Sequence, residues 1–247
     1  MRTLALSDLH LGRLSTSLRT PESLAPITEG FDRILLLGDV VDEWYLSRQQ
    51  AKDLEERVRA VCRAGGAGEV LWCRGNHDAN REEGEEYALL DGVLYLHGHA
   101  IYNKLNGSGP LREQIRAMNK ERFGPERGGS RKDQHTWRLV ERAYKSFPHV
   151  LLVPVLWRSS IKKRMLAVAQ EVSKEGPVGA MVLGHSHAPG VRHLNGLHVF
   201  NLGGWMQNTR ACGFVREDKN VRLIEIEKKH GTPQWGRVWH AATLGDD

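Results

Sequence analysis

The feature that most constrains this chain is a repeated pairing of a short apolar run with a cluster of chemically active polar side chains. The apolar runs are residues 3–7, 33–37, 69–73, 93–96 and 180–183. The clusters that follow them are Asp8-Leu9-His10, Gly38-Asp39-Val40-Val41-Asp42, Gly75-Asn76-His77-Asp78, His97-Gly98-His99 and Gly184-His185-Ser186-His187. Apolar runs of this length predict buried strands. Because layered α/β sheets bind ligands at the carboxyl ends of their strands, the pattern predicts one site at such an edge.

The segments between these runs predict the α/β class. Residues 49–64 repeat apolar side chains every three to four positions, as an amphipathic helix does, and the glycine-rich residues 65–68 end that helix. Beyond the fifth cluster, residues 191–193, 197–201, 212–216 and 221–226 predict further strands, the later ones in a meander. Strands alternating with helices favour a layered α/β core.

A basic segment interrupts this otherwise mildly acidic chain. Residues 104–174 contain 16 Lys and Arg against 6 Asp and Glu, a net charge of +10, whereas the whole chain carries +5. Helices are predicted at 111–123, 133–147 and 159–174. We therefore expect a single domain over residues 1–247 with a basic helical cap insert at 104–174, called the cap below. The cap suits an anionic partner such as phosphate, nucleic acid or an anionic membrane surface, although solvated helix faces would also explain it.

The composition excludes several other classes of protein. The three cysteines, Cys62, Cys73 and Cys212, are odd in number and scattered, which argues against a disulfide framework or a cysteine-based zinc site and favours a reducing compartment. No apolar run approaches the ~20 residues that a membrane span requires. The apolar stretch at the N-terminus is too short for a signal peptide. We therefore expect a cytoplasmic protein, with at most peripheral contact with the inner face of a membrane.

The residue types in the five clusters restrict their chemistry. Carboxylate, imidazole and carboxamide groups without thiolate favour a divalent transition metal, most of all Mn, with Fe or Zn as alternatives. Seven such ligands exceed the needs of one ion, and two ions that share an Asp would each have four protein ligands and open positions. Two ions ~3.5–4 Å apart form a clamp for displacement at phosphorus. Any one cluster alone could instead be a helix cap or an Asx turn.

The ordered set of clusters closely resembles the calcineurin-like metallophosphoesterase superfamily. Its blocks Asp-x-His, Gly-Asp-x-x-Asp, Gly-Asn-His-Asp/Glu, His and Gly-His-x-His all occur between residues 8 and 187. The resemblance implies a four-layer α/β/β/α sandwich with a dinuclear metal site at one edge. It implies that one ion binds Asp8, His10, Asp39 and His187, and that the other binds Asp39, Asn76, His97 and His185.

The same resemblance implies catalytic roles for Asn76, His77 and Asp78. His77 would lie beside the ions without binding them, and would stabilise charge on the phosphoryl oxygens or protonate the leaving group. Asp78 would orient the His77 ring. His99 would contribute at most from behind the ligands.

Within the superfamily, the chain is most similar to the UDP-2,3-diacylglucosamine hydrolases, which cleave the pyrophosphate of this nucleotide sugar to UMP and the acylated sugar 1-phosphate in lipid A synthesis. The similarity lies in residues 7–11, in residues 37–44 with Trp44 after the second Asp, in the basic insert and in residues 201–205. It implies a phosphorylated, lipid-linked substrate. The predicted substrate contacts are Trp44, Arg158, Lys162, Lys163 and Arg164. The chain departs from this subgroup at His77, where many members have Arg, and in the tail after Lys229.

Other functions stay open at this point. The chain could be another metallophosphoesterase that acts on a nucleotide or phosphodiester, or a nuclease, although no aromatic and basic stacking motif favours nucleic acid. It could also be a metal-free scaffold on the same fold, although a scaffold has no need of seven ligands. The sequence does not specify an oligomeric state.

Overall fold

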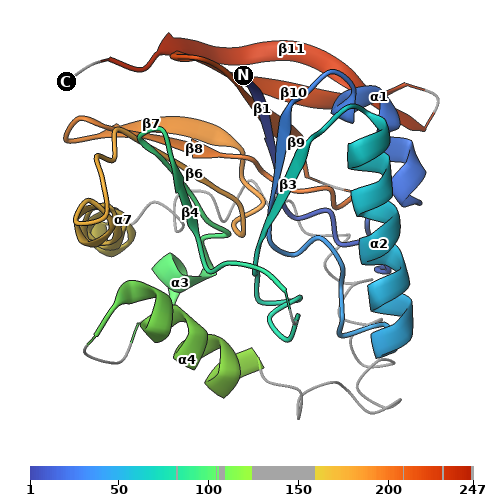
Figure 1. Ribbon diagram of the computed structural model, residues 1–247, viewed down its shortest axis with the longest axis horizontal. Helices are drawn as coiled ribbons and strands as arrows, with labels where there is room; N and C mark the ends of the chain where they lie inside the picture. Colours follow the sequence, from blue (N-terminus) through green and yellow to red (C-terminus); the bar gives the residue numbers. More distant parts are fainter. Residues whose placement is uncertain are drawn as a thin grey trace.

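A computed structural model describes residues 1–81, 83–103, 105, 109–123, 159–207, 209–229 and 231–245. Two β-sheets form its centre (Figure 1). The first has the order β11-β10-β9-β1-β2-β3, made of β11 (Thr232–Thr243), β10 (Asn220–Lys229), β9 (Ala211–Glu217), β1 (Arg2–Leu6), β2 (Arg33–Leu37) and β3 (Glu69–Cys73). The second has the order β4-β5-β6-β8-β7, made of β4 (Ala88–Leu90), β5 (Val93–Tyr95), β6 (Ala180–Leu183), β8 (Leu197–Asn201) and β7 (Gly190–Leu194).

Helices cover the outer face of each sheet (Figure 1). The short 3-10 helix η1 (Pro21–Leu24), α1 (Ala25–Thr28) and the long helix α2 (Arg48–Ala64) pack on the first sheet. Helices α3 (His99–Tyr102), α4 (Leu111–Phe123) and α7 (Ser159–Val172) pack on the second. The layers are therefore helix, sheet, sheet and helix, as expected from the sequence.

Side-chain alternation along the strands explains these layers. In β1, Leu4 and Leu6 face the core beside α2, whereas Ala5 faces the core between the sheets. In β5 and β6, Leu94 and Met181 likewise face the outer helices. Successive side chains of a strand point to opposite faces, so strands that are apolar on both faces become buried from two sides.

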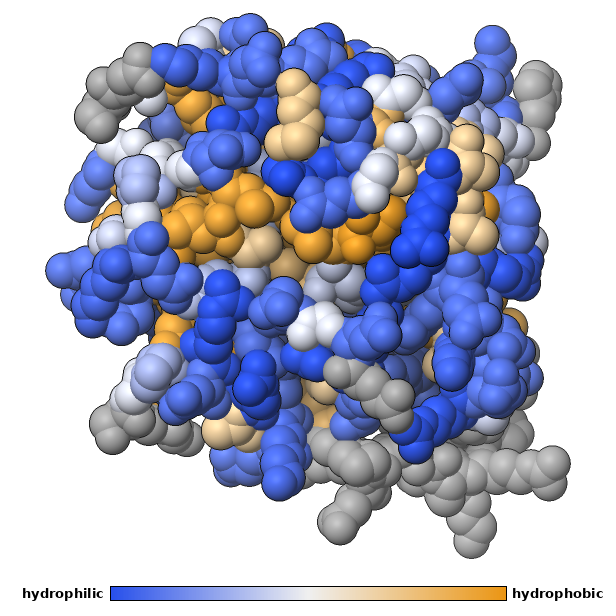
Figure 2. Space-filling view, viewed as in Figure 1, coloured by the Kyte–Doolittle hydropathy of each residue, from blue (hydrophilic) through white to orange (hydrophobic). Residues whose placement is uncertain are grey.

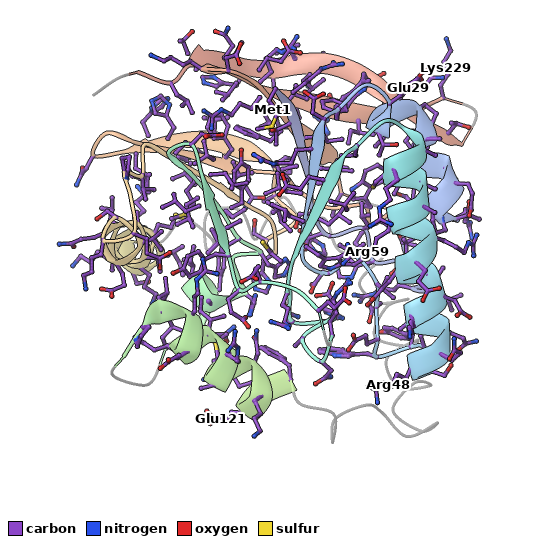
Figure 3. The ribbon with its side chains drawn as sticks, viewed as in Figure 1. Met1, Glu29, Arg48, Arg59, Glu121 and Lys229 are labelled. Carbon is purple, nitrogen blue, oxygen red and sulfur yellow. The ribbon has the colours of Figure 1, made fainter. Side chains whose placement is uncertain are left out.

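Local signals set the bounds of α2. Ser47 accepts a hydrogen bond from the Gln50 amide, and the Gln50 side chain accepts one from the Ser47 amide, which forms a capping box. Arg59 reaches from α2 to β3, where its guanidinium donates to the Val70 carbonyl at 3.3 Å (Figure 3). The helix therefore lies fixed along the edge of the first sheet.

The parallel strands bring the five polar clusters together. β1, β2 and β3 are mutually parallel, and so are β5, β6 and β8. The first, second, fourth and fifth clusters start within two residues of the ends of β1, β2, β5 and β6, and Asn76 follows β3 by three residues. The expected strand-end placement is confirmed.

Two strands were absent from the sequence prediction. β4 pairs with β5 through the Asp91-Gly92 turn, where both residues have positive φ, and Asp-Gly is a known hairpin signal. β11 extends the first sheet by antiparallel pairing with β10. The helices predicted at 111–123 and 159–174 are confirmed, the second ending at Val172. The helix predicted at 133–147 lies outside the described residues, so the extent of the cap stays a prediction.

Figure 2 shows hydrophobic residues gathered across the middle of one face, over the region of β3 and β4 in Figure 1. These two strands end their respective sheets, and their residues Val70, Leu71, Leu89 and Leu90 are half-buried. Among the described helices, none has the length and apolar character needed to cross a membrane.

Candidate metal centre

The first group of possible metal ligands consists of Asp8, His10 and His187. Nε2 of His187 lies 3.1 Å from Oδ1 of Asp8, and Nε2 of His10 lies 3.2 Å from Nε2 of His187. Asp8 and His10 follow β1, whereas His187 follows β6, so the group joins the ends of strands from both sheets. These donor atoms lie close enough together to hold one cation.

The second group consists of Asp39, His97 and His185. Nε2 of His97 lies 3.3 Å from Oδ2 of Asp39 and 3.3 Å from Oδ1 of Asn76. Nδ1 of His97 donates to the Leu37 carbonyl at 2.9 Å, which orients the ring with Nε2 toward Asp39. Fixing a ligand histidine through its other nitrogen is typical of metal sites.

Asp39 connects the two groups. Its Oδ2 lies 3.8 Å from Nε2 of His10 and 4.0 Å from Nε2 of His77, and these three residues form a third possible ligand group. One carboxylate therefore stands between ligands of two adjacent positions, as the predicted bridging Asp requires. The structure brings together all seven predicted metal ligands: Asp8, His10, Asp39, Asn76, His97, His185 and His187.

Two observations indicate that the seven predicted ligands suit divalent cations. Oδ1 of Asp8 is buried and accepts no well-aligned hydrogen bond within the described part of the chain, although Nε2 of His187 lies 3.1 Å from it. Five of these ligands, Asp8, His10, Asp39, His185 and His187, have positive φ between 49° and 66°. Left-handed backbone is strained for residues other than glycine, and such strain collects at functional sites.

The electrostatics of the cluster favour added positive charge. Burial alone would raise the pKa of Asp8, but His97 and His187 outweigh it and lower this pKa to about 2. Burial likewise opposes the charged form of His97, but Asp39 and Asp8 raise its pKa to about 10. The metal-free cluster therefore holds a proton at His97 between ionised carboxylates, where a metal ion would compete with that proton.

Asp42, for which the sequence pattern predicts no role, orients His77. Nδ1 of His77 donates to Oδ1 of Asp42 at 3.0 Å, and Oδ2 of the same carboxylate lies 3.4 Å from Nδ1 of His10. Burial alone would lower the pKa of His77, but Asp42 and Asp39 reverse this effect and raise it. Arg13 joins the group with Nη1 3.6 Å from Oδ2 of Asp42. The sequence signal that could have indicated this role is the position of Asp42 as the second Asp of the Gly-Asp-x-x-Asp block.

Asp78 has a different role from the one expected. Its carboxylate accepts from the amides of Asp39 and Val40 at 3.1 Å and from the Gly75 amide at 2.6 Å. Nε1 of Trp72 also donates to it, at 3.3 Å. The expectation that Asp78 orients the His77 ring is therefore wrong, because its oxygens are taken by the backbone of the ligand loops. Asp78 holds together the loops that follow β2 and β3.

The structure describes four of the five predicted substrate contacts, and these four differ in their surroundings. Trp44 lies at the centre, with its ring 4.0 Å from the His77 ring and tilted by 33°. Arg164 is turned inward and donates to the carbonyls of Ile101 and Tyr102. Lys162 and Lys163 are exposed on α7. Arg158 lies outside the described residues.

Comparison with known proteins defines the family. The model of the calcineurin-like phosphoesterase family matches residues 1–224, and the chain belongs to this family. No curated protein matches in sequence. The tail beyond residue 224, with the end of β10 and all of β11, lies outside the family match.

Similar solved structures support the fold. A dimetal phosphatase from Danio rerio is 13% identical, with 99% of each chain covered and a TM-score of 0.53. Wild-type Vps29 from Entamoeba histolytica complexed with Zn²⁺ is 14% identical, with 99% of this chain and 100% of that chain covered and a TM-score of 0.51. Vps29 from Chaetomium thermophilum is 12% identical, covering 100% of this chain and 97% of its own, with a TM-score of 0.53.

Proposed function

We propose that this protein is a dinuclear metal-dependent phosphoesterase. The observation that carries the proposal is the sharing of Asp39 between two buried ligand groups whose carboxylates and imidazoles converge. Two divalent ions held there, most favourably Mn²⁺, supply Lewis acidity toward water and the phosphoryl group. A donor set of oxygen and imidazole nitrogen suits Mn, Fe or Zn.

The chain's own residues supply the remaining chemistry. Asp42 keeps the proton of His77 on Nδ1, and its negative charge favours a second proton on Nε2. Nε2 is the nitrogen nearer Asp39, so His77 presents a proton donor toward the centre. Such a donor stabilises charge on a phosphoryl oxygen or protonates the leaving group. Asn76 supplies a carboxamide oxygen beside His97.

For the substrate, we propose the pyrophosphate of UDP-2,3-diacylglucosamine, cleaved to UMP and the acylated sugar 1-phosphate in lipid A synthesis. The support is the sequence similarity to that subgroup, Trp44 beside His77, and the basic character of the predicted cap. Lys162, Lys163 and Arg158 would contact the diphosphate or an anionic membrane surface, with the protein peripheral to the cytoplasmic face. Arg164 could contact the substrate only if its guanidinium broke its hydrogen bonds to the carbonyls of Ile101 and Tyr102 in α3.

A substrate panel tests both levels of the proposal. The Mn²⁺-loaded protein is assayed on UDP-2,3-diacylglucosamine, an unacylated UDP-sugar, bis-p-nitrophenyl phosphate and single-stranded DNA. Release of UMP from the acylated substrate alone supports the specific assignment, whereas efficient cleavage of DNA or of the unacylated sugar overturns it. A protein that binds no metal after Mn²⁺ loading is not a dinuclear enzyme, and a scaffold role would then replace the proposal.

A further inference from the structure

Helix α3 directly follows a predicted metal ligand. It begins one residue after Gly98, which follows His97 and has a φ of +104°. A helix of four residues is too short to be stable by itself. Its end groups also need partners from elsewhere in the protein. The position of α3 therefore depends on the side chains that surround it.

α3 packs against ligands of the second metal position. The ring centroid of His99 lies 5.2 Å from that of His97 and 6.3 Å from that of His185. The ring of Tyr102, at the other end of α3, lies 5.1 Å from the His185 ring. Both ends of α3 therefore support imidazoles of the group that contains Asp39, His97 and His185.

Helix α4 holds the first residue of α3 through a buried chain of hydrogen bonds. Nδ2 of Asn119 donates to Oε2 of Glu86 at 3.0 Å, and only its amide nitrogen can donate to a carboxylate. Oδ1 of Asn119 is thereby left to accept from Nε2 of His99 at 2.7 Å. Arg74 fixes the other oxygen of Glu86 at 3.0 Å. Glu86 and His99 are each 2% exposed, and Asn119 is 4% exposed, so the chain is shielded from water.

Helix α7 holds the end of α3. Nη1 of Arg164 donates to the carbonyl oxygens of Ile101 at 3.2 Å and Tyr102 at 3.0 Å. A cationic side chain at the last carbonyls of a helix satisfies them and complements the helix dipole. Arg164 is half-buried, unlike Lys162 and Lys163 beside it. Figure 1 shows α3 lying near both α4 and α7, and Glu121 marks the later part of α4 in Figure 3.

We propose that Asn119 and Arg164 are positioning residues that fix α3 against His97 and His185, so that helices α4 and α7 set the metal affinity of the second position. The inference rests on the proposed dinuclear site. Groups that hydrogen-bond metal ligands typically change metal affinity ~10–100-fold when they are lost, and we expect the lower end of this range because Asn119 and Arg164 act on His97 and His185 through α3. The first position contains Asp8, His10 and His187, and none of the hydrogen bonds or ring contacts of α3 described above involves these residues. The metal affinity of the first position should therefore stay unchanged.

Calorimetric titration with Mn²⁺ tests this proposal, together with thermal unfolding of each variant. Asn119→Leu and Arg164→Met remove the hydrogen bonds while keeping much of the side-chain volume. Lys120→Met is the matched control, because it removes one positive charge from an exposed position of α4. Both test variants should bind one Mn²⁺ like the wild type and the second at least about 10-fold more weakly. Arg164→Lys, which retains a donor, should recover part of the loss.

Two outcomes overturn the proposal. One is a pair of folded variants that bind both Mn²⁺ ions with wild-type affinity, even if their melting temperatures fall. The other is an equal weakening of both ions. If Asn119→Leu does not fold, Arg164→Met at its half-buried site decides the question. A wild-type protein that binds no Mn²⁺ contradicts the dinuclear site itself, which distinguishes that failure from the failure of the positioning role.

Discussion

Replacing Asp42 by Asn gives the sharpest test of how this centre works. Asp42 is fully buried, and its two oxygens lie 3.0 Å from Nδ1 of His77 and 3.4 Å from Nδ1 of His10. Arg13 is a further neighbour, with Nη1 3.6 Å from Oδ2 of Asp42. Asparagine keeps the shape of the side chain and one acceptor oxygen, but removes the negative charge that favours a protonated His77.

The size of the effect follows from the bond that weakens. A hydrogen bond to a charged group contributes about 1.5–3 kcal/mol. Taking about 2 kcal/mol as the loss at His77, and 1.36 kcal/mol per tenfold change in rate, kcat should fall roughly 30-fold. Asp42 is absent from the convergent ligand groups, so both metal ions should bind at saturating Mn²⁺, although the position that contains His10 should need more Mn²⁺ to fill because Asp42 lies behind that ring.

The assay is turnover of bis-p-nitrophenyl phosphate at saturating Mn²⁺, with metal content measured on the same samples. Asp78→Asn is the informative comparison, because Asp78 accepts from the amides of Gly75, Asp39 and Val40 rather than from His77. It should lower thermal stability more, and kcat at full metal occupancy less, than Asp42→Asn does. Wild-type kcat in a fully metal-loaded Asp42→Asn protein would refute this reasoning.

Three further predictions follow from individual residues. His77→Ala should lower kcat about 100-fold or more while both metals are retained, as metal analysis and turnover of the same sample will show. Gly38→Ala should destabilise the fold by about 2–3 kcal/mol in urea unfolding, because φ is +75° and a Cβ would lie 2.6 Å from Cα of Gly75; an unchanged midpoint would contradict this. Burial raises the pKa of Glu55 to about 7, despite the opposing charge of Arg81. The stability that this raised pKa contributes is complete below the unfolded value and disappears as pH rises through about 7. Glu55→Gln should therefore gain stability relative to the wild type from about pH 5 to about pH 8, and a constant difference would argue against the raised pKa.

Much of the fold could be predicted because its strands are buried on both faces. The apolar runs at Arg33–Leu37 and Ala180–Leu183 coincide with the buried strands β2 and β6, and the run at Glu69–Cys73 coincides with β3, which is only partly buried at the end of its sheet. A parallel strand that is buried on both faces is a continuous apolar run, so it can be recognised without knowing which strands it pairs with. β11 has no such pattern, since its residues are mostly half-buried or exposed without strict alternation, and the strand depends on pairing with β10.

The sequence by itself determined the strand-end clusters and hence the set of residues that could bind metal, because the carboxyl ends of parallel strands meet at one edge. Tertiary structure alone decided the partners behind those ligands. Asp42 rather than Asp78 reaches Nδ1 of His77, and Arg164 caps α3 instead of facing solvent. Such partners come from loops and helices distant in the chain, and a side chain's hydrogen-bond partner depends on distances of a few tenths of an ångström, which residue spacing does not specify.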